Sequence, residues 1–138
     1  AGTAVAAVGV AVWLRRRRHA SAQDGAAKVT ELWIYPIKSA GGCSVEAAEV
    51  TRFGLRWDRT FAVVAKGEIQ TQRQLPQLAT IRTRITENAL VLSAPGVAGE
   101  LTVPLSRGGL EPFVAKKLGS VALDLHCFRY GAEVSEWL

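Results

Sequence analysis

From Val29 onward, short runs of β-favouring residues alternate with turn residues at intervals of about ten residues. The clearest run is Thr60–Ala65, and the Lys66-Gly67 pair after it is typical of a tight hairpin turn. A looser run covers 44–51, residues 54–59 suggest a turn or loop, and further runs cover 68–71, 79–86, 89–93, 100–105 and 121–128. The spacing predicts a mainly β domain built as an antiparallel barrel or sandwich.

A single helical pattern occurs at the end of the sequence. Between Gly131 and Leu138, the apolar residues Val134, Trp137 and Leu138 follow helical spacing and would share one face. The pattern stops without a cap or a polar tail. We therefore expect a short C-terminal helix, and we expect that more chain once followed it.

The stretch Leu32–Ser39 combines a strand with polar groups. Pro36 has no backbone N–H, so the strand should lie at a sheet edge or end there. Lys38 and Ser39 follow, and then a glycine-rich turn with backbone N–H groups. An ammonium, a hydroxyl and such N–H groups can together bind an anion. The alternative is a solvated Lys-Ser turn at the end of an ordinary strand.

Two further polar groups accompany this stretch. Arg59 precedes the 60–65 run, where a rigidly held guanidinium could bind a phosphate with two hydrogen bonds, and Asp58 could orient it. The alternative is a local surface ion pair of little energetic weight. Thr71-Gln72-Arg73 is the third group, in which Thr71 and Arg73 could line the same site or merely cap a strand.

The length, composition and net charge limit the number of domains and the classes of partner that we expect. The chain has 138 residues, 49% hydrophobic and 21% charged, which suits one globular domain. Of its net charge of +5, Arg15–Arg18 contribute four. The rest is nearly neutral, so a nucleic-acid-binding face is not indicated.

The N-terminal residues predict a membrane anchor. Ala1–Leu14 is apolar, and Arg15–Arg18 follows it, whereas a secretory signal carries its charge first. The positive-inside rule would place the following domain in the cytosol. Fourteen residues are fewer than the ~20 that span a bilayer, so preceding residues would have to supply the length. A buried helix or a transit-type sequence is the alternative. We expect an anchor over residues 1–18, a linker over 19–28 and the β domain over 29–138.

Cysteine and histidine usage gives little support for metal or nucleophilic chemistry. Cys43 and Cys127 lack metal-ligand spacing and do not resemble a disulfide framework, which indicates a reducing compartment. His126 and Cys127 are neighbours that would point to opposite faces of a strand, one towards the core. We therefore assign no catalytic residue and no metal ligand.

Three blocks together resemble a known family. V-T-E-L-W-I-Y-P-I-K-S (29–39), G-L-R-W-D-R-T-F-A-V-V (54–64) and T-Q-R-Q-L-P-Q-L (71–78) resemble the N-terminal β-barrel domain of MOSC proteins. With the N-terminal segment before it, the chain looks like the mitochondrial amidoxime-reducing components. The C-terminal part of molybdenum cofactor sulfurases also carries this domain, but behind a large aminotransferase-like domain.

The resemblance implies a fold, a cofactor and partners. It implies an antiparallel β-barrel that helps to hold the pterin phosphate of the molybdenum cofactor, with Lys38, Ser39 and Arg59 as the binding residues. Such enzymes reduce N-hydroxylated compounds with electrons from NADH through NADH-cytochrome b5 reductase and cytochrome b5. They lie in the outer mitochondrial membrane and face the cytosol.

The sequence also departs from the family. The family continues into a MOSC domain that supplies the cysteine ligand of molybdenum, and neither Cys43 nor Cys127 matches that ligand. Before the last helix the family usually has Asp-Cys-Gly, where this chain has Arg129-Tyr130-Gly131. We therefore expect this chain alone to be inactive as an enzyme. A membrane-tethered β domain that acts only by interaction is the alternative.

Overall fold

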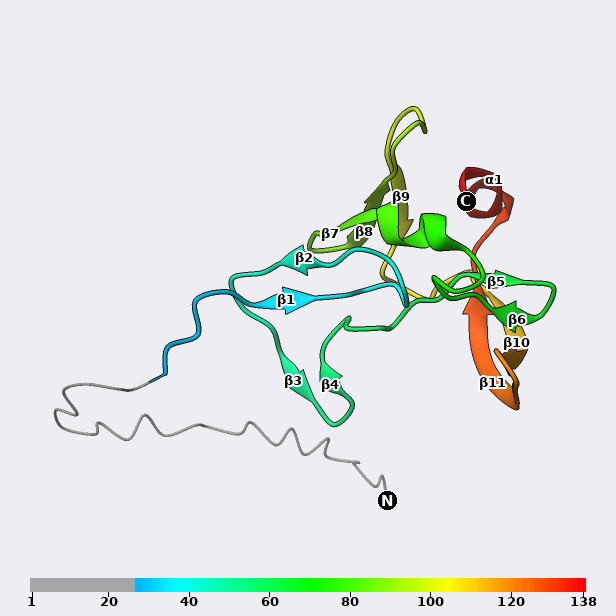
Figure 1. Ribbon diagram of the computed structural model, residues 1–138, viewed down its shortest axis with the longest axis horizontal. Helices are drawn as coiled ribbons and strands as arrows, with labels where there is room; N and C mark the ends of the chain where they lie inside the picture. The colour runs from blue at the N-terminus through cyan, green and yellow to red at the C-terminus, as the bar shows by residue number, and fades with distance from the viewer. Residues whose placement is uncertain (1–26) are drawn as a thin grey trace, which may run out of the picture.

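The structure, a computed structural model, describes residues 27–138. It is mainly β, as the turn spacing predicted, and it also has one short 3₁₀-helix and one short C-terminal α-helix (Figure 1). The elements in chain order are β1 (Trp33–Ile34), β2 (Cys43–Ser44), β3 (Val50–Thr51), β4 (Gly54–Leu55), β5 (Val64–Ala65), β6 (Glu68–Ile69), η1 (Pro76–Thr80), β7 (Arg82–Ile85), β8 (Ala89–Ser93), β9 (Leu101–Pro104), β10 (Glu111–Leu118), β11 (Val121–Arg129) and α1 (Ala132–Trp137).

The strands form four separate hydrogen-bonded sheets. A four-stranded sheet has the order β11-β10-β6-β5, and a three-stranded sheet has the order β7-β8-β9. The pairs β1-β2 and β3-β4 complete the set. All pairings are antiparallel except β10 with β6, which is parallel.

The predicted closed barrel is therefore not found within residues 27–138. Strand β1 ends before Pro36, which has no N–H to continue a ladder. Beyond it, a single isolated bridge between Ile37 and Phe61 connects this segment to the next block. A closed barrel needs each strand to pair with the next around the whole circumference. The four sheets here are separate, so that continuous pairing is interrupted.

Local patterns predicted some strands well and others poorly. The hairpin turn at Lys66-Gly67 is confirmed, with φ values of 52° and 77° that suit a two-residue turn. Strand β8 has the predicted bounds. The predicted run Thr60–Ala65 is wrong over residues 60–63, because only Val64–Ala65 forms a strand. Strand β10 was not predicted at all.

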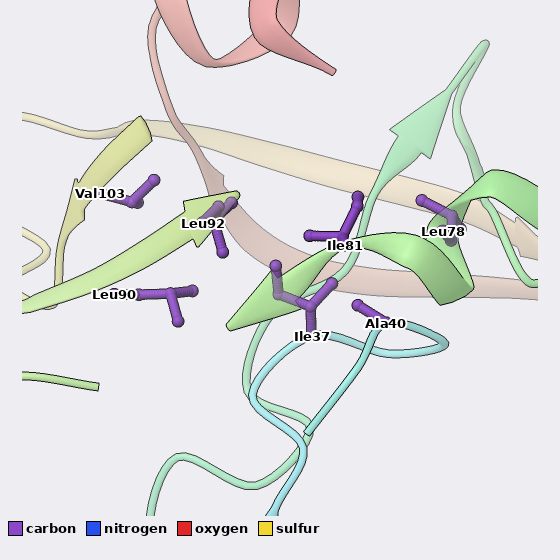
Figure 2. Close-up of a cluster of buried hydrophobic side chains, with 7 residues drawn as sticks. All are labelled: Ile37, Ala40, Leu78, Ile81, Leu90, Leu92 and Val103. Atoms are coloured by element: carbon purple, nitrogen blue, oxygen red, sulfur yellow. The ribbon is translucent and has the colours of Figure 1, made fainter. Parts of the chain in front are cut away.

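The core lies between the three-stranded sheet, helix η1 and the segment after β1. Ile37 and Ala40 of that segment and Leu78 of η1 belong to the same buried cluster as side chains of β8 and β9 (Figure 2). The seven members are Ile37, Ala40, Leu78, Ile81, Leu90, Leu92 and Val103. Residues on either side of Lys38-Ser39 are thus fixed in the core.

The C-terminal helix is confirmed as α1. Val134 and Trp137 are half-buried and pack against the core cluster, as their spacing predicted. Leu138 does not share that role, since 51% of it is exposed beyond the end of the helix. Leu138 is the C-terminal cap of the helix, and its amide donates to the Val134 carbonyl at 3.3 Å.

The predicted membrane anchor, residues 1–18, lies outside the described residues, as does most of the predicted linker. Among residues 27–138, no helix has both the length and the apolar character needed to cross a bilayer.

Candidate anion-binding site

The segment that carries Lys38 and Ser39 is held from both sides by buried residues. Pro36 and Ile37 precede the pair and Ala40 follows it, and all three are buried. Lys38 and Ser39 themselves are half-buried. Ser39 has a φ of 67°, a left-handed conformation that is uncommon outside glycine and that reverses the chain here. The core therefore fixes the backbone from which these two polar side chains extend.

Arg59 lies beside the same segment, although it comes from a different loop. Its amide donates to the carbonyl oxygen of Tyr35 at 2.7 Å. Two more bonds continue the contact, from Phe61 N–H to the Pro36 carbonyl at 3.0 Å and from Lys38 N–H to the Phe61 carbonyl at 2.9 Å. The backbones of the first two sequence blocks thus run side by side at this point.

Asp58 connects the two blocks and restrains Arg59. One carboxylate oxygen, Oδ1, accepts a hydrogen bond from the Tyr35 amide at 2.8 Å. The other, Oδ2, accepts one from the Arg59 guanidinium at 2.5 Å. The Arg59 side chain is 66% exposed, against 22% for Asp58. Arg59 therefore has a fixed partner on one side and a solvent-facing side that remains accessible.

The third block also reaches this segment. Gln72 donates from Nε2 to the carbonyl oxygen of Ser39 at 2.9 Å. Thr71 plays a local part, because its hydroxyl accepts from the Arg73 amide at 3.3 Å and bonds to the side chain of Gln74. Thr71 thus organises a turn, while Gln72 supports the Lys38-Ser39 backbone. Sequence reasoning grouped Gln72 with its neighbours without giving it this role.

Two amides of the glycine-rich turn, which the sequence suggested as free donors, are already paired within the chain. The Ala40 amide donates to the Ile37 carbonyl at 3.2 Å, and the Gly41 amide donates to the Ile81 carbonyl at 2.9 Å. A Cβ at Gly41 would lie 2.7 Å from that Ile81 oxygen, so glycine is required here for close packing. Within residues 27–138, the amide of Ser39 donates no intramolecular hydrogen bond.

The available donors are therefore mainly side chains. Lys38 offers an ammonium, Ser39 a hydroxyl and an amide, and Arg59 a planar guanidinium. Such a set can bind a phosphate oxygen by charge-assisted hydrogen bonds. In the described part of the chain, no group of histidine, cysteine or acidic residues could hold a metal ion.

The His126-Cys127 pair takes the half-and-half arrangement that its position in a strand predicted. His126 is exposed, whereas Cys127 is half-buried and donates from Sγ to the Phe113 carbonyl at 3.4 Å. Both cysteines are free thiols.

Comparison with known proteins identifies the group to which this chain is similar. Residues 26–138 match the family described as "MOSC N-terminal beta barrel domain". Mouse mitochondrial amidoxime-reducing component 1 is 34% identical over 99% of this chain, and human mitochondrial amidoxime reducing component 2 is 39% identical over 99%. The bovine mitochondrial amidoxime reducing component 2 is 46% identical over 55% of it.

The chain spans about two fifths of these relatives. The mouse match covers 41% of the relative's length, the human match 42% and the bovine match 24%.

Proposed function

The chain belongs to the MOSC N-terminal beta barrel domain family, and we propose that it forms the N-terminal part of a molybdenum cofactor-dependent reductase of N-hydroxylated compounds. Two kinds of evidence support this. The relatives that cover nearly the whole chain are named amidoxime-reducing components. The three family-like blocks also meet around one segment, at Tyr35, Asp58, Arg59 and Gln72.

The proposed task of this domain is to hold the phosphate of the pterin cofactor. Lys38 contributes a point charge, Ser39 a hydroxyl and Arg59 a fork of donors with one face towards solvent. The single observation that carries this role is the hydrogen bond from the Arg59 amide to the Tyr35 carbonyl, which joins the Arg59 loop to the segment of Lys38. When bound, the molybdenum cofactor supplies the metal centre at which the substrate is reduced.

The reaction itself is proposed to need groups beyond this chain. In the family that this chain resembles, a cysteine of the MOSC domain is the molybdenum ligand, and neither Cys43 nor Cys127 is assigned that role. A benzamidoxime reduction assay with the 138-residue chain, cofactor and electron-transfer proteins should accordingly give no turnover. Turnover comparable to that of a full-length family member would contradict the proposal.

The cellular setting is part of the same proposal. The relatives are named as mitochondrial. We place this protein at the outer mitochondrial membrane, with the β domain in the cytosol, and cytochrome b5 and NADH-cytochrome b5 reductase as its electron donors. Fractionation of a tagged chain should recover it with mitochondrial membranes, and deletion of residues 1–18 should release it. A soluble intact chain would contradict this placement.

The site is tested by cofactor retention in a full-length protein that includes this domain. Arg59→Ala should weaken cofactor binding by about 1.5–3 kcal/mol and so lower the molybdopterin content after gel filtration. Arg59→Lys should recover only part of that binding, because the bidentate geometry is lost. Arg56→Ala is the matched control, because Arg56 is an exposed arginine in a 2.6 Å ion pair with Glu49. A circular dichroism melt should show all variants folded. Full cofactor content in Arg59→Ala, or its loss through unfolding, would make Arg59 a structural partner of Asp58.

A further inference from the structure

Ser39 is the third residue of a tight turn and has a strained backbone. The Ala40 amide donates to the Ile37 carbonyl at 3.2 Å, which closes a four-residue turn with Lys38 and Ser39 at its centre. The φ of Ser39 is 67°, and glycine is the usual residue where the third turn position needs a positive φ. A serine in this conformation is maintained only where the surrounding contacts hold it there.

A side chain from the third sequence block contacts this turn. Nε2 of Gln72 donates to the Ser39 carbonyl oxygen at 2.9 Å, across 33 residues of sequence. Gln72 belongs to a turn of its own, in which the Leu75 amide donates to the Thr71 carbonyl at 2.8 Å. Leu75 packs against the core cluster, so the backbone that carries Gln72 is fixed. The Gln72 side chain therefore joins the strained turn to a second turn that the core holds in place.

The core holds the ends of the Ser39 turn more firmly than its centre. Ile37 and Ala40 are buried members of the core cluster (Figure 2), whereas Ser39 is half-buried. Within residues 27–138, the Ser39 amide donates no intramolecular hydrogen bond, and the Ser39 carbonyl accepts the bond from Gln72. Because φ is the rotation about the bond between the amide nitrogen and Cα, it sets the relative directions of the amide and the side-chain hydroxyl. A change in φ would therefore separate the two donors that Ser39 offers to an anion.

We propose that Gln72 is a positioning residue of the anion site, which holds Ser39 in the left-handed conformation that directs its amide and hydroxyl to the anion. The inference rests on the proposed function, because it assigns Gln72 a role at the same site. Gln72 acts through Ser39 and not by contact with the anion. Only molecules with the competent turn bind, so a lower population of that turn weakens the apparent affinity by the same factor.

Gln72→Met tests this role, because it removes the donor but keeps a long, uncharged side chain. The 138-residue chain is titrated with inorganic phosphate and followed through the Ser39 amide signal. Gln72→Met should bind phosphate about three- to tenfold more weakly, which is the worth of one neutral hydrogen bond. Gln77→Met is the matched control, since Gln77 is an exposed glutamine on η1, and it should leave the phosphate affinity unchanged.

A second readout follows the conformation of Ser39 without phosphate. The nuclear Overhauser effect between the amide proton and Hα of one residue is strong only at positive φ, where the two protons are closest. It should be strong for Ser39 in the parent chain and in Gln77→Met, and weaker in Gln72→Met. An effect of equal strength in all three would overturn the positioning role, even if phosphate binding were weakened.

Ser39→Gly distinguishes positioning from direct contact between Gln72 and the anion. Glycine adopts a positive φ without strain, so the turn no longer depends on Gln72. In the Ser39→Gly background, Gln72→Met should therefore change the phosphate affinity by less than about twofold. A glutamine that contacted the anion itself would lose the same factor in both backgrounds.

The titrations also separate this inference from the proposed function. Absence of phosphate binding to the parent chain would overturn both. Binding by the parent chain with unchanged affinity in Gln72→Met, or with the same loss in both backgrounds, would overturn the positioning role alone. A circular dichroism melt that showed Gln72→Met unfolded would also overturn it, because Gln72 would then stabilise the whole domain.

Discussion

The backbone amide of Tyr35 donates a hydrogen bond of 2.8 Å to Oδ1 of Asp58, twenty-three residues further along the chain. The same carboxylate accepts from the Arg59 guanidinium through Oδ2. One side chain therefore joins the segment after β1 to the loop after β4 and also positions the arginine. The stability of this junction and the orientation of Arg59 depend on the same group.

Substitution of Asp58 should separate these two roles. Asp58→Asn retains an oxygen for the Tyr35 amide but loses the ion pair, so the free energy of unfolding should fall by less than about 1 kcal/mol. Asp58→Ala leaves the amide without its acceptor and should cost about 1–2 kcal/mol. Urea denaturation of the two variants measures the difference. Equal losses would show that the hydrogen bond to Tyr35 contributes nothing.

Tyr130 should make stability depend on pH in the alkaline range. Its hydroxyl donates to the Pro104 carbonyl at 2.8 Å, and burial raises its pKa above the ordinary value of 10.0, although Arg107 opposes the shift. The folded state then holds the phenolic proton more tightly than the unfolded state. This contribution is complete below about pH 10 and is lost as the pH rises through the raised folded pKa.

Tyr130→Phe removes that contribution and provides the check. At neutral pH the variant should lose about 0.5–1.5 kcal/mol with the hydrogen bond to Pro104. Thermal melts between pH 8 and 11 should then show a shallower alkaline decline than the parent chain shows. An identical decline would mean that other groups cause it.

Trp137 should contribute to stability through its ring and not through its nitrogen. The side chain packs against the core cluster, and Nε1 is buried without a hydrogen-bond partner among residues 27–138. Trp137→Ala should therefore cost about 2–3 kcal/mol, since the residue is half-buried. Trp137→Phe keeps most of the apolar contact, omits the unpaired N–H and should cost clearly less. Chemical denaturation measures both, and equal costs would point to the indole nitrogen.

The sequence predicted features that depend on neighbouring residues. The Lys66-Gly67 turn and helix α1 follow from local dihedral preferences and from helical spacing. Strand β10 escaped prediction because Pro112, Lys116 and Lys117 interrupt its apolar pattern, and pairing with β11 determines its conformation.

The side chains of the candidate site could be predicted from the sequence, but the backbone amides that are free to donate could not. Lys38, Ser39 and Arg59 were recognisable from residue chemistry and from the resemblance to a family. The amides of Ala40 and Gly41, by contrast, are taken by Ile37 and Ile81, and the second of these contacts joins residues forty positions apart. Periodicity carries no information on such long-range hydrogen bonds, and for the same reason it did not reveal that the sheets remain separate.

Titration of the isotope-labelled 138-residue chain with inorganic phosphate, followed by nuclear magnetic resonance, tests the central claim most directly. Phosphate should bind through charge-assisted hydrogen bonds to the Lys38-Ser39 segment and Arg59. We predict saturable shifts of the Ser39 amide and the Arg59 side-chain N–H signals in the parent chain. The shift of the Ser39 amide should be abolished in Arg59→Ala, and both shifts should be retained in Arg56→Ala. Shifts that persist unchanged in Arg59→Ala, or that are absent from the parent chain, would contradict an anion site at these residues.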